Sequence, residues 1–257
     1  MSMNDQLSYA FHMADWRIER ANNHITHVKQ IIEWIVHPDQ YTAFPYRDPN
    51  SGHYGLSVGP KHGALPRHLP IVMGEAIHNL SIALDYLWNG VVRVVSPDLK
   101  GREHFPRHKC RRELVDKVSK TPVVQKLPAA KDFIVDHIRP YKDGNLLLWT
   151  IGKLDNIDKH RLLISCLTIA KFGKFVATGE DGSIIDLSHS TLNTHGPSLT
   201  LGFASPFKLN DDAEITVNVA FDEPEDIAPG QPVLETLVNF SQTTKEVVEA
   251  FRGFFLK

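Results

Sequence analysis

One otherwise apolar segment, residues 74–88, contains four polar residues whose types could do chemistry: Glu75, His78, Asn79 and Asp85. Residues three, four or seven apart lie on one side of an α-helix, so a helix here would place Glu75, His78 and Asp85 along one line. An imidazole beside carboxylates can take up or release a proton near neutral pH, and a carboxylate can orient it. The same residue types can bind a metal ion. The segment therefore predicts an acid–base site or a metal site.

A second group of ionisable residues closes another predicted helix and consists of Asp158, Lys159, His160 and Arg161. Lys and Arg can neutralise a phosphoryl group, and Arg can bind two of its oxygens at once. Cations in the last turn of a helix are also favoured by the helix dipole alone. Because buried imidazoles and carboxylates need partners, we expect residues 155–161 to meet the first segment.

The main hypothesis is a metal-independent hydrolase that acts on phosphodiesters. His78 and His160 would act as general acid and base. Lys159 and Arg161 would neutralise the phosphoryl charge, and a carboxylate of the first segment would orient an imidazole. The candidate catalytic residues are His78, His160, Lys159, Arg161, Glu75, Asp85, Asn79 and Asp158.

Two alternatives stay open. The first is a non-catalytic binding or scaffold protein in which the polar residues form a buried structural network. The second is a metal-dependent enzyme, whose ligands would be Glu75, His78, Asp85, Asp158 and His160. The main hypothesis needs neither a cofactor nor a resident metal. The partners that it implies are RNA or a small phosphorylated ligand, with a second copy of the chain, as a homodimer, as a further candidate.

The helix that must carry the first group shows a regular apolar repeat. Apolar residues recur there at alternating steps of four and three, which predicts a helix that ends near residue 95, before Pro97. They are Met73, Ile77, Leu80, Leu84, Leu87, Val91 and Val94. Ile82, Trp88 and Val92 lie near the polar line, so we expect this helix to be largely buried on both sides.

Other helices follow from the same kind of repeat. A stripe that starts at Leu7 and ends at Ile35 predicts one long bundle helix over about residues 5–36, which stops before Pro38. Further helices are expected at residues 111–119, 129–137 and 145–159. Val233, Leu237 and Phe240 begin the stripe of a closing helix.

Strand-like segments fill much of the remaining chain. Residues 41–46 and 54–58 flank a turn-rich linker and predict a hairpin, and later strands are expected at 162–170, 175–178, 183–187, 199–203 and 214–221. The fold class is therefore α+β, a predominantly helical bundle with an antiparallel β-sheet or hairpin region and a C-terminal helix. We expect a single domain over residues 1–257, helical at about 1–161 and 232–257 and β-rich at about 162–231.

Composition and charge are those of an ordinary soluble globular protein. The chain has 257 residues, 42% hydrophobic and 23% charged, and a net charge of −2, which argues against broad nucleic-acid affinity but leaves room for a local basic patch. Its two cysteines, Cys110 and Cys166, lie far apart and are expected to be reduced thiols. The sequence predicts no membrane-spanning segment and no signal peptide, so the expected location is the cytoplasm.

Several enzyme classes are disfavoured by motifs that the sequence lacks. It contains no Gly-rich phosphate loop, no dinucleotide fingerprint, no nucleophile elbow and no zinc-spaced Cys/His array. The absence of these motifs disfavours nucleotide-dependent kinases, Rossmann enzymes and the common serine hydrolases.

The chain resembles a family of uncharacterised bacterial proteins over most of its length. The family pattern is a long first helix, a hairpin, a helix Gly-[Asp/Glu]-x-x-His-Asn-Leu-Arg-[Ser/Thr]-Ala-Leu-Asp-[His/Tyr], a Phe-Pro loop, a Pro-Tyr ahead of a Leu-Trp helix, and a closing Asn-x-Asp-Lys-His-Arg. The matching positions are Gly74 to Tyr86, Phe105-Pro106, Pro140-Tyr141, Leu148-Trp149 and Asn156 to Arg161. The family has no assigned reaction, so the resemblance implies a fold and two motifs but no substrate.

One departure from the family pattern concerns Ser81, which stands where the family has Arg. If that Arg serves chemistry in relatives, this chain has lost it or recruits another cation. The family helix with its Arg-x4-His spacing is also similar to helical RNases of the HEPN type, and this similarity implies RNA as the substrate class and a toxin or defence role. Here Ser81 and Tyr86 occupy the two positions of that spacing. Arg17–His24 and Arg20–His27 show an Arg-x6-His spacing that chance alone can produce.

Overall fold

The computed structural model describes residues 2–37, 41–60, 66–99, 101, 103–161, 164, 166–194, 199–203, 205–210, 213–222, 228 and 230–256. Within these ranges, side chains are described except at 41–44, 60, 160–161, 167–168, 170, 192–194, 199 and 215. The chain forms two compact units. The helical unit comprises residues 1–26, 71–164 and 235–257, and the β-rich unit comprises residues 27–70 and 165–234.

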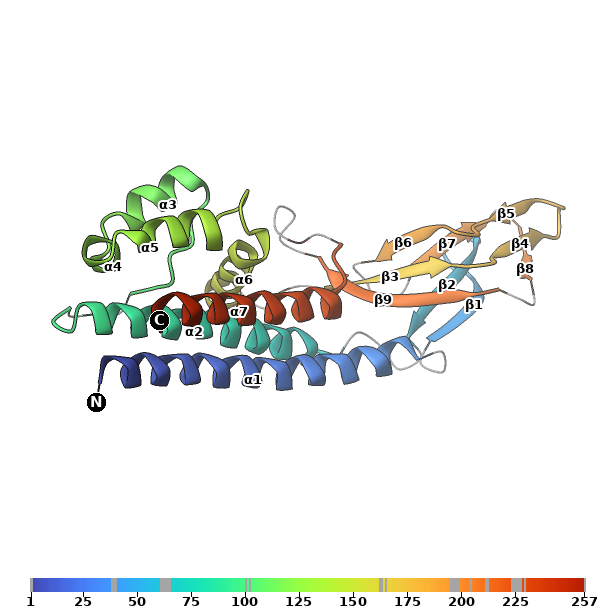
Figure 1. Ribbon diagram of the computed structural model, residues 1–257. Helices are drawn as coiled ribbons and strands as arrows, with labels where there is room; N and C mark the ends of the chain where they lie inside the picture. Colours follow the sequence, from blue (N-terminus) through green and yellow to red (C-terminus); the bar gives the residue numbers. More distant parts are fainter. Residues whose placement is uncertain are drawn as a thin grey trace. The chain divides into compact units, whose positions relative to one another are not determined.

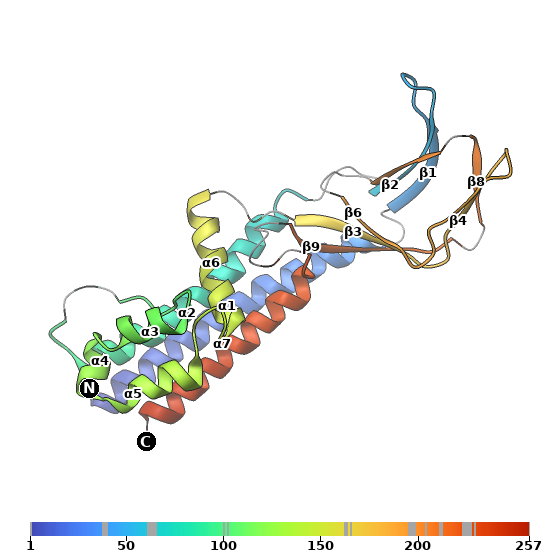
Figure 2. The ribbon, with the colours of Figure 1, turned by 90° about the horizontal axis from the view of Figure 1, so that it is seen from above.

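Three long helices provide most of the helical unit (Figure 1): α1 (Met3–Val36), α2 (Leu69–Val95) and α7 (Val233–Phe255). Residues 27–36 of α1, 69–70 of α2 and 233–234 of α7 belong to the β-rich unit. The three helices run side by side in both Figure 1 and Figure 2. Arg252 on α7 binds Asp15 on α1, and Ser241 on α7 binds Asn22 on α1, so α7 is antiparallel to α1. α2 also runs antiparallel to α1, because His24 meets Glu75 and Arg17 meets Tyr86. The helical unit is therefore an antiparallel bundle like the one that the sequence predicts.

The stripe of α1 confirms the predicted periodicity, because all nine of its apolar residues are buried: Leu7, Phe11, Ala14, Ile18, Ala21, Ile25, Val28, Ile32 and Ile35. On α2, no residue from 76 to 92 is exposed. The predicted burial of this helix on both sides is thus confirmed for its central turns. It ends at Val95, where Pro97 disfavours a further turn.

Shorter helices complete the helical unit. They are α3 (Arg111–Val118), α4 (Pro122–Lys126), α5 (Ala129–Asp132), a π-helical turn (Phe133–Ile138) and α6 (Leu146–Arg161). Phe133 stacks on Phe254 of α7, with ring centres 4.3 Å apart. Asn145 caps α6 by accepting a hydrogen bond from the backbone N–H of Leu148 at 3.1 Å. The sequence predicted the others but not α4, which is a single turn with little periodicity.

Three antiparallel sheets of three strands form the β-rich unit. The first is β1 (Tyr41–Arg47), β2 (Tyr54–Pro60) and β7 (Leu199–Phe203); the second is β6 (Thr191–Thr194), β3 (Cys166–Phe172) and β9 (Ile215–Phe221); the third is β5 (Ile184–Asp186), β4 (Val176–Gly179) and β8 (Phe207–Leu209). The predicted hairpin is confirmed by the register Ala43 to Val58 and Tyr46 to Gly55.

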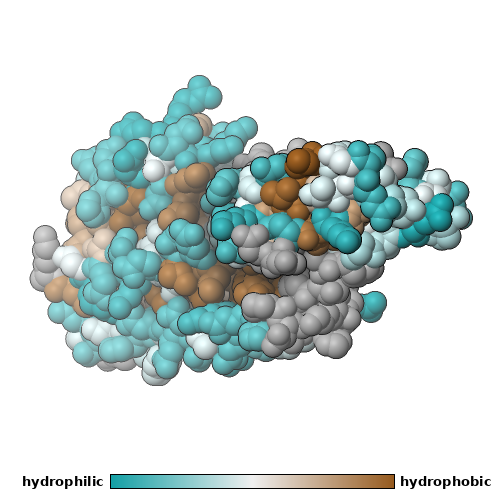
Figure 3. Space-filling model, turned by 90° about the vertical axis from the view of Figure 1, so that its right-hand side faces the viewer, coloured by the Kyte–Doolittle hydropathy of each residue, from teal (hydrophilic) through white to brown (hydrophobic). Residues whose placement is uncertain are grey.

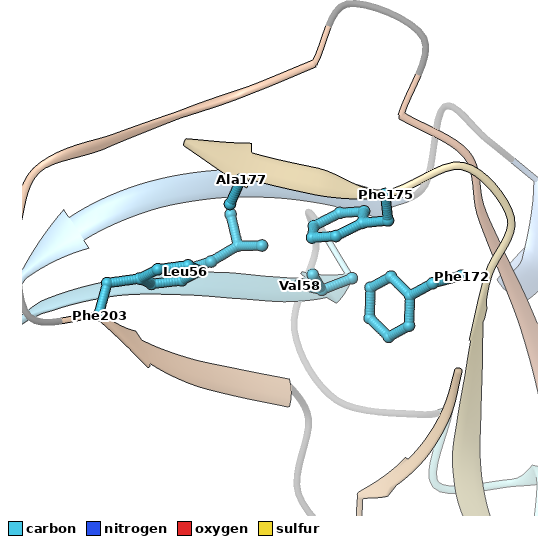
Figure 4. Packing of buried hydrophobic residues seen from close by; sticks show 6 residues of the cluster. All are labelled: Leu56, Val58, Phe172, Phe175, Ala177 and Phe203. Carbon is cyan, nitrogen blue, oxygen red and sulfur yellow. The ribbon is translucent and has the colours of Figure 1, made fainter. Parts of the chain in front are cut away.

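The hairpin belongs to the β-rich unit because β2 pairs with β7, Leu56 lying opposite Leu201. The sequence-based division had left it with the helical part. Leu56 and Val58 of β2 pack with four buried residues of the other strands and turns, as Figure 4 shows: Phe172, Phe175, Ala177 and Phe203. This core explains the grouping, since long-range pairing and burial, not proximity in the sequence, decide which sheet a hairpin joins.

β3 begins at Cys166, and residues 162, 163 and 165 of the predicted start of this strand lie outside the described residues. The strands β6 and β8 were not predicted, since runs of three or four residues show too little alternation to be recognised.

Polar and charged residues cover most of the face that Figure 3 shows, with hydrophobic residues visible in patches between them. In the part of the chain that the structure describes, no helix combines the length and the apolar character that crossing a membrane would require.

Candidate functional site

The polar residues of α2 meet side chains from α1, from α6 and from the loop at residues 103–108, all within the helical unit. His78 lies against α6, where its Nδ1 is 2.8 Å from Oδ1 of Asp155. The expected meeting of residues 74–88 with residues 155–161 is confirmed by this contact. Asp155 supplies it, although the sequence analysis selected Asp158 as the candidate carboxylate.

Asp155 is the most enclosed carboxylate of this site, with only 7% of its side chain exposed. Its second oxygen, Oδ2, accepts a hydrogen bond from Nζ of Lys159 at 2.7 Å. The hydroxyl of Ser81 also forms a hydrogen bond with the Asp155 carboxylate. Burial by itself raises the pKa of Asp155, but the hydrogen bonds from Lys159, Ser81 and His78 outweigh burial and hold the pKa below its usual value. Asp155 is therefore a stable anion at neutral pH.

The imidazole of His78 is half-buried, with 40% of its side chain exposed. With the proton on Nδ1 donated to Asp155, the lone pair on Nε2 can accept a proton. Among the described residues, His78 Nε2 has no hydrogen-bond partner. An imidazole oriented by a carboxylate, with its other nitrogen open, is the arrangement of a general base.

Asp158 follows Asp155 by three residues and lies over Gly74 of α2. A Cβ atom on Gly74 would overlap the Asp158 carboxylate, so glycine leaves the space that this side chain occupies between the two helices. Burial, followed by repulsion from the Asp155 carboxylate, raises the pKa of Asp158. The two aspartates of one helix thus have pKa values displaced in opposite directions.

The Nδ1 atom of His24 on α1 is 3.1 Å from Oε2 of Glu75. Glu75 is exposed, and its negative charge contributes to the raised pKa of Asp158. The structure therefore adds α1 to α2 and α6 as a third source of ionisable groups around His78.

Asn79 and Tyr86 bind α1 through one arginine. Nη1 of Arg17 donates to Oδ1 of Asn79 at 3.2 Å, and Nη2 donates to the hydroxyl of Tyr86 at 3.2 Å. The amide of Asn79 donates in turn to the backbone carbonyl of Glu75 at 2.8 Å. Asn79 is buried, so the structure gives it a position between two helices rather than one open to solvent.

Asp85 lies apart from these groups and binds the loop at residues 103–108. Its Oδ1 accepts from the backbone N–H of Phe105 at 2.9 Å, and its Oδ2 is 2.8 Å from Nδ1 of His104. Asn89, one turn further on, bonds to both backbone groups of Glu103. Asp85 does orient an imidazole, as expected, but that imidazole is His104 and not His78.

Arg107 from the same loop reaches into the space beside Ser81. Its Nη2 donates to the Ser81 hydroxyl at 2.9 Å and lies 3.8 Å from Oδ1 of Asp85. Gly152 of α6 leaves room for it, since a Cβ there would lie 2.9 Å from Nε of Arg107. The structure thus places a cation beside the position where the resembling family has Arg. Burial lowers the pKa of Arg107, and the Asp85 and Asp155 carboxylates oppose this.

Sequence reasoning missed Asp155 and Arg107. Asp155 carried one usable signal, its position four residues before Lys159, which is the spacing of a helical ion pair. Arg107 carried none, because a loop has no periodicity that indicates where a side chain points. The side chains of His160 and Arg161 lie outside the described residues, although their backbone belongs to α6.

The ligand set of the metal-dependent alternative is divided between partners. His78 pairs with Asp155, whereas Asp85 pairs with His104 and Phe105. Over the described ranges, no group of three or more His, Cys, Asp or Glu residues is placed to hold a metal ion.

Comparison with known proteins adds no assignment: no protein family, no curated protein and no solved structure matches this chain.

Proposed function

We propose that the protein cleaves RNA phosphodiester bonds without a metal, using His78 as the general base. One observation carries the proposal: the Asp155–His78 pair, in which a buried anion holds Nδ1 at 2.8 Å while Nε2 stays open. RNA suits such a site because its 2′-hydroxyl is an internal nucleophile that needs only a base. We place the reaction in the cytoplasm, as the sequence leads us to expect.

Each residue then has one task in the reaction. Nε2 of His78 takes the proton of the 2′-hydroxyl, the 2′-oxygen attacks phosphorus, and the bond from phosphorus to the 5′-oxygen breaks. His160, the acid selected from the sequence, protonates the leaving 5′-oxygen. The products are a 2′,3′-cyclic phosphate and a free 5′-hydroxyl. The half-exposed ammonium of Lys159, held by Asp155, balances the charge that grows on the phosphoryl oxygens.

The test is a cleavage assay with the dinucleotide UpA and with its analogue that lacks the 2′-hydroxyl. We expect UpA to be cleaved in the presence of EDTA and the analogue to be resistant. His78→Ala should lower the rate by about 100-fold or more, the usual contribution of a general base. His104→Ala is the matched control, because His104 also has Nδ1 at 2.8 Å from a carboxylate. Equal losses in both variants, or no cleavage by the wild type, would overturn the proposal.

A non-catalytic scaffold role is the second candidate, and a different observation favours it. Arg17, Asn79, Asp85 and Asn89 all bind groups on other elements; Asn79 is buried and the other three are partly buried. If His78 is part of the same structural network, His78→Ala should reduce the melting temperature by several degrees, as the loss of a buried hydrogen bond would. A melting curve recorded for the variant used in the cleavage assay separates the two functions.

A further inference from the structure

Three lysines converge on one edge of the helical unit: Lys109, Lys142 and Lys153. The backbone N–H of Lys142 donates to the carbonyl of Lys109 at 3.3 Å, which holds the two residues side by side. The ammonium groups of Lys142 and Lys153 both lie over the ring of Trp149, at 5.0 Å and 5.6 Å from its centre. We call these three lysines the basic edge.

No lysine of the basic edge has a carboxylate partner among the residues that the structure describes. Two other exposed cations of the helical unit do have carboxylate partners: Lys120 pairs with Asp116 at 2.8 Å, and Arg111 pairs with Asp136 at 2.7 Å. Lys109 and Lys153 are exposed and Lys142 is half-buried. Their charge is therefore available to an outside anion.

The distribution of charge between the two units points the same way. The helical unit has 21 Lys and Arg against 17 Asp and Glu, whereas the β-rich unit has 7 against 13. The net charges are thus +4 and −6, and the total of −2 conceals this difference. A polyanion is attracted to the unit with the positive net charge, and within it to cations that lack acidic partners.

We propose that the basic edge binds the phosphate backbone of single-stranded RNA, leading it to the His78–Asp155 pair. Lysine ammonium groups bind phosphates as point charges, without reading sequence. Lys153 and Asp155 both belong to α6, and Lys109 follows two residues after Arg107, which bonds to Ser81. The choice of RNA among polyanions rests on the proposed function. That the basic edge binds a polyanion does not rest on it.

The test measures binding of a fluorescein-labelled 20-nucleotide single-stranded RNA by fluorescence anisotropy, with His78→Ala in every protein so that the RNA stays intact. The triple variant Lys109→Gln, Lys142→Gln, Lys153→Gln removes the basic edge. The control triple Lys29→Gln, Lys120→Gln, Lys245→Gln makes the same change in net charge at other exposed lysines. Titrations at several NaCl concentrations between 50 and 200 mM give the salt dependence.

We expect the basic-edge triple to weaken binding about 30-fold at 50 mM salt and to reduce the slope of log K against log salt by about 2, since each phosphate contact in a single strand contributes about 0.7. The control triple should change neither by a comparable amount. Equal losses in the two triples, tighter binding of duplex DNA than of RNA, or no binding by the His78→Ala parent would each overturn the proposal.

A second readout separates this proposal from the proposed function. UpA is too short to extend from a catalytic site to a remote backbone contact, so the basic-edge triple, with His78 restored, should cleave UpA at the wild-type rate and long RNA more slowly. Loss of UpA cleavage in His78→Ala concerns the proposed function alone. Binding without any cleavage would leave the basic edge standing and remove the catalytic proposal.

Discussion

Among the described residues, the helical unit contains two histidine–aspartate pairs with the same contact and different surroundings. In each, Nδ1 of the histidine is 2.8 Å from an aspartate oxygen: His78 with Asp155, and His104 with Asp85. The His78 side chain is 40% exposed and that of His104 is 79% exposed. Contact distance alone therefore does not distinguish a catalytic pair from a structural one.

The difference lies in what else each aspartate binds. The remaining partners of Asp155 are side chains, the hydroxyl of Ser81 and the half-exposed ammonium of Lys159. Asp85 instead holds a backbone N–H, that of Phe105, and faces the guanidinium of Arg107. Asp85 thus fixes a loop to α2, whereas Asp155 collects groups that can exchange protons or bind phosphate. The groups that an aspartate binds besides the histidine therefore indicate the role of the histidine–aspartate pair.

Asp85→Ala should have the largest effect on stability, about 3 kcal/mol in the free energy of unfolding. It leaves the Phe105 N–H without its acceptor and removes the nearest carboxylate from the buried cation of Arg107. Urea unfolding followed by circular dichroism measures it. A loss below about 1 kcal/mol would show that the loop does not depend on Asp85. The structural role that distinguishes Asp85 from Asp155 would then be contradicted.

Gly74→Ala should cost about 2 kcal/mol, because the added Cβ occupies the position of the Asp158 carboxylate and overpacks the contact of α2 with α6. The double variant with Asp158→Ala should recover most of that loss. A double-mutant cycle by thermal unfolding checks this coupling. Additive losses would mean that Gly74 is needed for some reason other than the approach of Asp158.

Asp155→Asn should reduce stability by about 2 kcal/mol at pH 7, since the buried anion and its three hydrogen bonds are replaced by a neutral amide. The pKa of Asp155 is lowered in the folded state, so its contribution is fully present above the unfolded pKa and is lost as pH falls through the lower folded pKa. Unfolding measured from pH 7 down to pH 3 should therefore show wild type and variant converging in acid. Curves that stay parallel would contradict this assignment.

Asp158→Asn should act in the opposite sense and by much less, a gain of a few tenths of a kcal/mol at pH 7. Burial and the Asp155 charge raise the pKa of Asp158 in the folded protein. Its ionisation therefore lowers stability as pH rises from the unfolded pKa through the raised folded pKa. The measurement is the same unfolding series, with Asp155→Asn alongside. A destabilised variant would show that Asp158 makes a favourable contact as an anion.

The spacing of residues in the sequence was sufficient to predict the long helices and the contact of residues 74–88 with residues 155–161. The apolar repeats of α1, α2 and α7 are properties of neighbouring turns, so they can be read from the spacing of residues. The long stripes of α1 and α2 are buried as the spacing predicts. His78 found its partner in residues 155–161 because a polar group inside an apolar helix must bond to the element packed on it.

Tertiary structure decided which residue takes each place. Asp155, not Asp158, faces His78, because packing turns α6 so that Asp155 is buried and Asp158 lies on Gly74. Arg107 stands beside Ser81 only because Asp85 and Asn89 hold its loop on α2. Such contacts join residues 14 or more positions apart in the sequence, and the spacing of neighbouring residues does not indicate them.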